Sequence, residues 1–341
     1  MKKLICSVLL LFVVVLLASC EHGKLPDSEW QFVAPETLGV NGALLDKLHS
    51  ELENEEIYSV VAVKDGYIID EYYKQGFDEN SRFAMYSCTK SITSALIGIA
   101  IDKGIISGAE VRLVDYFPQL ANAENEDKQA ITIEHLLNQT SGISWAESPG
   151  QSLRHMVKEE KNWVDFILSQ PMAAKPGAKF NYRTGNSHLL TAILQQAAGE
   201  TANSFASKFL FKPIGIHSVR WSVDPQGVAA GGNGISMTTR DAARFGQLYL
   251  NGGRWGEQQV VPETWVAKSA QKQSEGQPGS VFTHGYQWWI GETMYFAQGH
   301  GGQYIFVVPE LELVTVVTGN LSGNAGLPRR YFAEYIVAAC G

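Results

Sequence analysis

The sequence predicts an α+β fold, in which one antiparallel sheet flanked by helices is built from both chain ends and a mostly helical lobe fills the middle. Three patterns support this prediction: β-rich runs near the N-terminus, helical segments separated by proline and glycine over residues 111–215, and strand patterns in the final third. With 341 residues, 45% of them hydrophobic and 18% charged, the chain can form a sizeable core. We expect a cleft between the two lobes, a usual place for a site.

The N-terminus has the pattern of an export signal. Two lysines precede an apolar run over residues 4–18, which is shorter than a transmembrane helix requires. Residues 17–20, Leu-Ala-Ser-Cys, resemble the bacterial lipobox, which implies cleavage after residue 19 and a lipid on Cys20. A plain secretory peptide or a short anchor is the alternative. We therefore expect a signal over 1–19, a tether over 20–35, a folded domain over 36–341, and a lipid-anchored location in the bacterial cell envelope, facing the periplasm or the exterior.

Net charge bears on the possible partners of the protein, and cysteine content bears on its possible disulfide bonds. The formal net charge is −8, and removal of a leader with two lysines and no acidic residue makes it −10, so no nucleic-acid partner is expected. Two of the four cysteines would leave with the leader or carry lipid, and Cys88 and Cys340 remain. A bridge between them is possible in an oxidising compartment, but the place of Cys88 in a buried helix start argues against it.

The first part of the folded domain reads as a helix, a hairpin and a second helix. Leucines at helical spacing predict a helix over 41–55, and two β-rich runs around Asp65-Gly66 predict a hairpin over 58–73. A nearly uncharged run follows Ser87 and ends at Lys103-Gly104, which predicts a buried helix closed by glycine. The serine would thus follow directly after a sheet.

The rest of the chain gives helices first and strands later. Helices are expected over 132–138, 163–168, 187–198 and 202–211, and over 239–250, where Thr239 is the expected cap. Strands are expected over 285–290, 293–297, 303–308 and 311–318, and a final helix over 330–339.

A possible nucleophile lies at the start of the helix that follows the hairpin. Ser87 and Lys90 form a Ser-x-x-Lys pair, and on a helix their side chains are neighbours on one face. The hydroxyl would also lie at the positive end of the helix dipole, which suits acyl transfer. A second Ser-x-x-Lys copy at 269–272 lies in a polar stretch without such a helix, and we expect no catalysis there.

Two later stretches could complete a site around Ser87. Tyr182 lies on a glycine-containing turn before a helix and could relay protons if Lys90 lowered its pKa. The glycines of His300-Gly-Gly302 open a strand, where a backbone N–H can donate to an oxyanion. Considered singly, Tyr182 could simply pack a loop, His300 could be structural, and the glycines could form a bulge.

These three stretches, in this order, resemble the serine β-lactamase and penicillin-binding protein superfamily, in its class C-like branch of esterases, peptidases and amide hydrolases. Ser87-Cys-Thr-Lys90 matches Ser-x-x-Lys, Tyr182-Arg-Thr184 occupies the Tyr-x-Asn place, and His300-Gly-Gly302 occupies the Lys-Thr-Gly place. The phrases over 115–118, 132–142, 241–250 and 285–289 also look like that branch, so the resemblance covers roughly 36–338. The phrases around Ser87 and over 185–190 are most similar to the 6-aminohexanoate-dimer hydrolase and carboxylesterase members.

The resemblance implies a β-lactamase/transpeptidase-like fold and a role for each site residue. Ser87 would be acylated, Lys90 and Tyr182 would together move its proton, and the backbone N–H groups of Ser87 and Gln303 would form the oxyanion hole. Thr184, His300, Gly301 and Gly302 would contact the substrate. Neither Lys90 nor Tyr182 is singled out as the base.

Two departures from the family pattern bear on the substrate. Thr184 stands where the family has an asparagine that contacts a substrate amide, and His300 stands where it has a carboxylate-binding lysine, so a fixed cation is lost. We therefore expect hydrolysis of a small-molecule ester or amide, such as a D-amino-acid peptide, rather than efficient β-lactam hydrolysis. The alternative is a penicillin-binding or peptidoglycan-sensing lipoprotein with little turnover.

No cofactor and no metal are expected. The sequence contains no His-Glu-x-x-His, no paired-cysteine metal site, no phosphate-binding Gly-x-x-x-x-Gly-Lys and no Gly-x-Ser-x-Gly elbow. The glycine cluster at 231–234 lacks the third glycine of a dinucleotide fingerprint.

Overall fold

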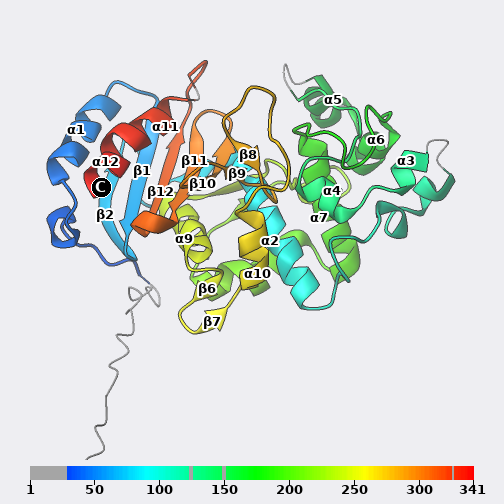
Figure 1. The fold of residues 1–341 in the computed structure, drawn as a ribbon, viewed down its shortest axis with the longest axis horizontal. Coiled ribbons are helices and arrows are strands. Elements are labelled where there is room, and N and C mark those ends of the chain that lie inside the picture. The colour runs from blue at the N-terminus through cyan, green and yellow to red at the C-terminus, as the bar shows by residue number, and fades with distance from the viewer. Residues whose placement is uncertain (1–28, 123–125, 148–150, 325) are drawn as a thin grey trace, which may run out of the picture.

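The computed structural model describes residues 29–122, 126–147, 151–324 and 326–341. Its main sheet has seven strands in the order β2-β1-β12-β11-β10-β9-β8 (Figure 1), and every pairing between them is antiparallel. The strands are β1 Ile57–Lys64, β2 Tyr67–Tyr73, β8 Thr283–His284, β9 Trp289–Ile290, β10 Tyr295–Gly299, β11 Gln303–Val308 and β12 Leu313–Gly319. Because β1 pairs with β12, the two chain ends share one sheet, which confirms the predicted α+β architecture.

The hairpin between β1 and β2 turns at Asp65 and Gly66. Both residues have positive φ, 51° and 82°, as a two-residue type I′ turn requires. This turn matches the right-handed twist of the paired strands, so the Asp-Gly signal predicts the hairpin correctly.

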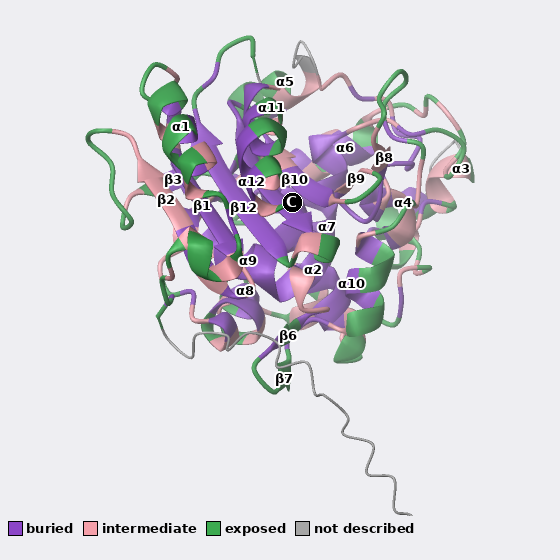
Figure 2. Ribbon diagram, turned by 60° about the vertical axis from the view of Figure 1, so that its left-hand side comes forward, coloured by how far each residue is buried: buried purple, intermediate pink, exposed green. Residues whose placement is uncertain are grey.

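Helices cover both faces of the sheet, and side chains alternate between the two layers along each strand. On β1, Val60 and Ala62 pack with α1 (Gly42–Leu52) and the C-terminal helical segment, whereas Val61 and Val63 belong to the core that contains α2 (Thr89–Asp102) and α9 (Thr239–Leu250). This period of two is that of a strand buried on both faces. Figure 2 shows the central strands as buried throughout.

The C-terminal segment and the 41–55 region fold as helices with shifted bounds. The final helix consists of α11 Leu327–Tyr331, a π-helical stretch Phe332–Val337 and α12 Ala338–Cys340, and thus begins before the predicted 330. The side chain of Asn41 caps α1 by accepting from the backbone N–H of Ala43.

The region between the sheet halves is dominated by helices, drawn in green on the right of Figure 1. These are α3 Glu126–Gln129, α4 Ile133–Leu137, α5 Gln151–Glu159, α6 Trp163–Ser169, α7 Thr184–Ala198 and α8 Ala202–Ala206, followed by a π-helical stretch Ser207–Phe211. The same region contains 3-10 turns at Leu113–Asp115, Pro118–Asn122 and Lys212–Ile214, and another 3-10 turn, Pro35–Leu38, precedes α1. A small sheet joins β3 Arg82–Ala84, β5 Ile235–Thr238 and β4 Arg220–Trp221, and a short ribbon of β6 Arg254–Trp255 and β7 Gln258–Gln259 precedes α10 Glu263–Ser269. In Figure 1, α2 lies between the sheet and these helices.

Three local predictions are wrong. Residues 285–290 are not one strand, because Gln287 has φ 66° and the N–H of Gly285 donates to the carbonyl of Trp288 at 2.8 Å, which makes a turn between β8 and β9. The cap of α9 is Thr238 rather than Thr239, since the Thr238 hydroxyl accepts from the backbone N–H of Asp241. Helix α7 begins three residues before the predicted start at 187, which places Thr184 in its first turn.

Two further findings concern cysteines and membrane spans. Cys88 and Cys340 are free thiols, in agreement with the argument against a bridge. Among the described residues no helix has the length and apolarity needed to cross a bilayer. The predicted signal, most of the tether and Cys20 lie outside the described residues.

Candidate active site

Ser87 lies where the chain passes from the small sheet into α2. A 3-10 turn, Tyr86–Cys88, precedes the helix, and the backbone of Met85 is tied to β5 by an N–H···O bond of 2.9 Å to Ile235. Tyr86 has a φ of 44°, a left-handed conformation that is unfavourable for a tyrosine. A Cβ on Gly299 would lie 2.4 Å from the Met85 carbonyl, so only glycine lets the end of β10 approach this turn.

Lys90 meets three acceptors, one of which is the predicted nucleophile. Its Nζ lies 3.0 Å from Ser87 Oγ, 3.0 Å from Thr184 Oγ1 and 2.8 Å from the Gly232 carbonyl oxygen. As an ammonium it can donate to all three. As a neutral amine it has two N–H donors, and its lone pair can accept the proton of Ser87. The Ser-x-x-Lys spacing therefore yields the expected contact.

The environment of Lys90 lowers its pKa toward neutral pH. The residue is 1% exposed, and this burial lowers its pKa to about 8, although the negative charge of Glu147 acts in the opposite direction. Burial disfavours a charged form because water no longer solvates it. A minor fraction of Lys90 is thus unprotonated at neutral pH and the larger part above about pH 8, and this neutral form can act as a general base.

Tyr182 also forms a hydrogen bond with Ser87, but its pKa is raised, so the condition that Lys90 lowers this pKa is not met. Desolvation among aromatic rings raises the pKa of Tyr182, and this effect exceeds that of the hydrogen bond with Ser87. Its ring stacks on Trp289 at 5.7 Å and lies edge-on to His284 at 6.3 Å, while Lys90 Nζ is 4.8 Å from the ring centre. Tyr182 therefore remains a protonated hydroxyl beside the serine.

Thr184 faces Lys90 and not the cleft. Its hydroxyl oxygen lies 3.0 Å from Lys90 Nζ and donates to the Glu147 carboxylate, and the residue is 3% exposed. The resemblance assigned this position to substrate contact. The structure instead brings it into the hydrogen-bond network behind the serine.

Ser87 opens into a cleft of about 430 Å³ that also contains Tyr182 and His300. Aromatic side chains form part of its wall, and Arg329 is its one lining arginine or lysine among the described residues. The remaining lining residues are Gln277, Ser280, Phe282, Trp289, Gln298 and Gly299. The cleft thus combines an apolar wall with a few polar groups, as small-molecule sites do.

The predicted oxyanion region lies at the edge where β10 turns into β11. His300 packs edge-on against Tyr86 at 5.6 Å, and Gly301 and Gly302 form the turn with φ of 76° and 95°. The Gln303 side chain fixes this turn by donating to the carbonyls of His300 at 2.9 Å and Gly319 at 2.6 Å. Cys88 Sγ lies 3.6 Å from the Gln303 carbonyl, which brings the backbone of residue 303 close to that of the Ser87 turn.

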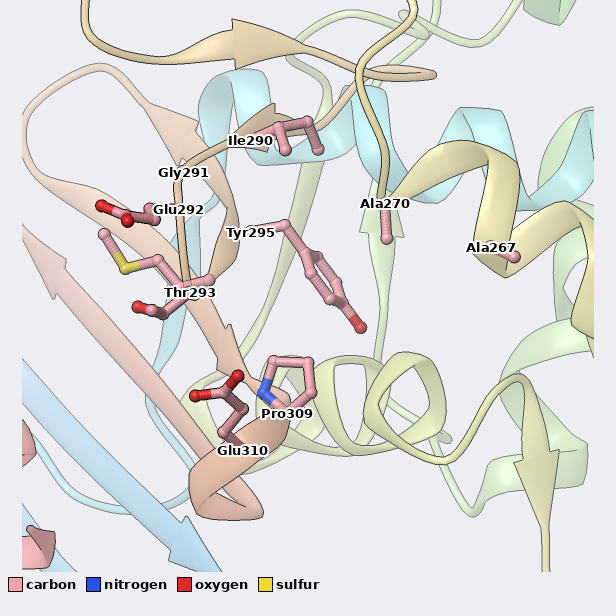
Figure 3. A pocket seen from close by; sticks show the side chains of 10 residues that line it. Ala267, Ala270, Ile290, Gly291, Glu292, Thr293, Tyr295, Pro309 and Glu310 are labelled. Atoms are coloured by element: carbon pink, nitrogen blue, oxygen red, sulfur yellow. The ribbon is translucent and has the colours of Figure 1, made fainter.

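The second Ser-x-x-Lys copy has no comparable surroundings. The Ser269 hydroxyl donates back to the Trp265 carbonyl at 2.7 Å, and Lys272 pairs with Glu275 at 2.8 Å. A separate pocket of about 370 Å³ near this region, shown in Figure 3, is lined by residues of the β9–β10 turn, α10 and the segment after β11. Its described lining includes none of the predicted site residues. No group of three or more His, Cys, Asp or Glu side chains in the described ranges could hold a metal ion.

Sequence reasoning missed four residues of this site. They are Glu147, Gly232, His284 and Arg329. Gly232 belongs to the 231–234 cluster, and a Cβ there would lie 2.6 Å from Thr184 Cγ2, so glycine is needed for its carbonyl to reach Lys90. The glycine cluster is visible in the sequence, but nothing in the sequence shows that the Gly232 carbonyl accepts from Lys90.

Comparison with known proteins identifies the family to which this chain belongs. Residues 55–338 match the Beta-lactamase family. The chain is 24% identical over 293 residues to a 6-aminohexanoate-dimer hydrolase of Paenarthrobacter ureafaciens, with 80% of this chain and 74% of that protein covered.

Two solved structures show the same fold at low identity. The first is EstCE1, a hydrolase with promiscuous acyltransferase activity, with a TM-score of 0.73, 17% identity and coverage of 90% of this chain and 99% of that one. The second is the octameric penicillin-binding protein homologue from Pyrococcus abyssi, with a TM-score of 0.68, 19% identity and coverage of 89% and 76%. Since the family match spans most of the chain, this protein belongs to the beta-lactamase family of serine hydrolases.

Proposed function

We propose that this protein hydrolyses a small-molecule ester or amide through an acyl-enzyme at Ser87. The observation that carries the proposal is the 3.0 Å contact between Ser87 Oγ and the buried Nζ of Lys90, whose other two partners are fixed acceptors. A serine needs a base within this distance to become a nucleophile. The family membership and the hydrolase names of the similar proteins support the same reaction class.

In the acylation step, Ser87 Oγ forms a bond to the substrate carbonyl carbon while its proton moves to neutral Lys90. The bond from that carbon to the leaving oxygen or nitrogen then breaks, and Tyr182 gives the leaving group a proton that the Lys90 ammonium replaces. Water next attacks the acyl ester and gives a proton to Lys90, which passes it to Ser87 Oγ as the acid departs. The backbone N–H groups of Ser87 and Gln303 are the proposed oxyanion donors.

A substrate panel tests this proposal. Short-chain p-nitrophenyl esters, linear amide oligomers, D-Ala-D-Ala peptides and a chromogenic cephalosporin should separate ester or amide hydrolysis, which we expect, from β-lactam hydrolysis. Release of one equivalent of product followed by no turnover would instead favour the penicillin-binding alternative. Absence of both burst and turnover, together with no labelling of Ser87 by a fluorophosphonate, would overturn the proposal.

Arg329 makes a carboxylate-bearing substrate the expected class, despite the histidine at position 300. Its guanidinium lies over the Phe282 ring at 5.2 Å, and no carboxylate of the described residues pairs with it. Replacement of Arg329 by alanine should raise KM for a carboxylate-bearing ester about 10-fold, because one charged contact of this kind contributes on the order of 1.4 kcal/mol. KM for the matched neutral ester should stay the same.

The neighbouring Arg330 offers a matched control for this test. It is exposed, lies outside the cleft and pairs loosely with Glu334 at 3.9 Å. Arg330→Ala should leave KM for both esters unchanged. Equal losses for the charged and neutral esters in Arg329→Ala would contradict the carboxylate prediction.

The proposed location is outside the cytoplasm, with the mature protein lipid-anchored through Cys20. The support is the pattern of residues 1–20 in the sequence. Cys20→Ala should abolish incorporation of labelled palmitate and move the protein from the membrane fraction. Unchanged lipid incorporation in this variant would contradict the lipidation site.

A further inference from the structure

Glu147 is a carboxylate at the catalytic centre that the proposed mechanism does not use. Its Oε2 accepts the backbone N–H of Thr184 at 3.0 Å and also the indole N–H of Trp145. Its Oε1 accepts the hydroxyl of Thr184, which in turn lies against Lys90. A continuous chain of hydrogen bonds therefore runs from Ser87 through Lys90 and Thr184 to Glu147.

We propose that Glu147 is a positioning residue: by accepting the hydroxyl proton of Thr184, it fixes that hydroxyl as an acceptor toward Lys90 and directs the lysine lone pair at Ser87. This inference rests on the proposed function, because it concerns how the same serine is activated. Glu147 itself does not touch the reacting atoms.

The directions of the hydrogen bonds around Lys90 leave its lone pair free to face Ser87. A threonine hydroxyl has one proton, and in Thr184 that proton is given to Glu147, so toward Lys90 the oxygen can only accept. The Gly232 carbonyl can also only accept. Both N–H groups of a neutral Lys90 are thereby engaged, and the lone pair is left for Ser87. If the Thr184 hydroxyl pointed the other way, it would donate to that lone pair and compete with the serine.

Charge supports the same arrangement. Burial is the largest effect on Lys90 and lowers its pKa, and the coulombic effect of Glu147 acts in the opposite direction. Burial raises the pKa of Cys88 and of Tyr182, so both stay neutral, and it lowers the pKa of buried His284 to about 3, so this ring is neutral as well. Among the groups around Lys90, Glu147 is the carboxylate that acts to raise the Lys90 pKa. Its removal should let the Lys90 pKa fall further.

A purely structural role is the competing explanation. Thr184 begins α7, and Arg183 at the N-cap makes no side-chain cap, so the bond from the Thr184 N–H to Glu147 also stabilises the helix start. A cap alone would affect folding stability. It would have no reason to move the pH at which Ser87 becomes reactive.

The test measures the rate of Ser87 labelling by a fluorophosphonate across neutral and mildly alkaline pH, a readout that needs no knowledge of the substrate. In Glu147→Gln, the half-maximal point of the pH profile should move to lower pH, and the plateau rate should fall on the order of 10- to 100-fold through misorientation. Glu147→Asp keeps the charge and should hold the half-maximal point near that of the parent protein. Glu159→Gln, which removes an exposed carboxylate from α5, is the matched control.

A second pair of variants tests the hydroxyl itself. Thr184→Val should lower the plateau rate, and Thr184→Ser, which keeps a hydroxyl, should restore most of it. Thermal melting of each variant separates loss of folding from loss of activation. An unmoved pH profile in a folded Glu147→Gln, or a full plateau rate in Thr184→Val, would overturn the inference. Failure of the parent protein to label at Ser87 would instead overturn the proposed function.

Discussion

Replacement of Ser87 by alanine should reduce kcat/KM by on the order of 10⁴- to 10⁶-fold, since removal of a nucleophile eliminates the covalent route. The hydroxyl is the group within 3.0 Å of Lys90 Nζ that opens into the cleft. The lost side chain is small and lies at a partly exposed position, so folding should be preserved. The measurement is kcat/KM on the best ester of the substrate panel, with mass spectrometry of the fluorophosphonate adduct.

The chain provides a matched control in its second Ser-x-x-Lys copy. Ser269→Ala removes a buried hydroxyl that donates to the Trp265 carbonyl and also contacts Tyr249, far from Ser87 in the sequence, and it should retain both turnover and labelling. Labelling that persists in Ser87→Ala, or that disappears in Ser269→Ala, would identify a different nucleophile.

The fold could be predicted where a local pattern has a single structural solution. Asp65-Gly66 predicts the hairpin because both turn residues need positive φ, and the run after Ser87 predicts α2 because helical burial on all sides needs an uncharged sequence. The same holds for β11, whose predicted bounds of 303–308 are those observed. The sequence indicates that both chain ends share one sheet, but it does not indicate which residues of β1 and β12 pair.

Local patterns gave a wrong prediction where a residue forms hydrogen bonds with a segment far away in the sequence. The 285–290 stretch is rich in aromatic residues, as a strand is, but Gln287 takes a positive φ so that its buried amide can donate to the carbonyls of Leu136 and Leu137. That bond joins segments about 150 positions apart in the sequence. A strand would turn the amide away from those carbonyls.

In the candidate site, too, contacts between residues close in sequence could be predicted, whereas contacts between distant segments could not. Ser87 and Lys90 are close in sequence, and the helix brings their side chains together by its own geometry. Glu147, Gly232 and Arg329 reach the site from three separate segments, and no spacing rule connects them to Ser87. The condition that Lys90 lowers the Tyr182 pKa fails for a related reason, since the burial that raises this pKa becomes visible only in the fold.

The buried position of Lys90 predicts how activity depends on pH. Below its pKa of about 8 the side chain is an ammonium, which donates to Ser87 and cannot take its proton. Above that value the amine is neutral and can act as the base. The rate of Ser87 acylation should therefore rise with pH and level off above about 8.

Replacement of Lys90 by methionine should remove this pH dependence and lower kcat/KM by about 10²- to 10⁴-fold, the usual contribution of a general base. Methionine has a similar length but leaves the Gly232 carbonyl without the lysine donor, at a cost of about 1–3 kcal/mol in the free energy of unfolding, so melting must be checked alongside activity. Tyr182→Phe should keep the rise with pH, because Tyr182 stays protonated in this range. Lys103→Met, an exposed lysine just after the same helix, should match the parent protein. If the rise with pH survives in Lys90→Met but is lost in Tyr182→Phe, the tyrosine is the base and the buried lysine only supports it.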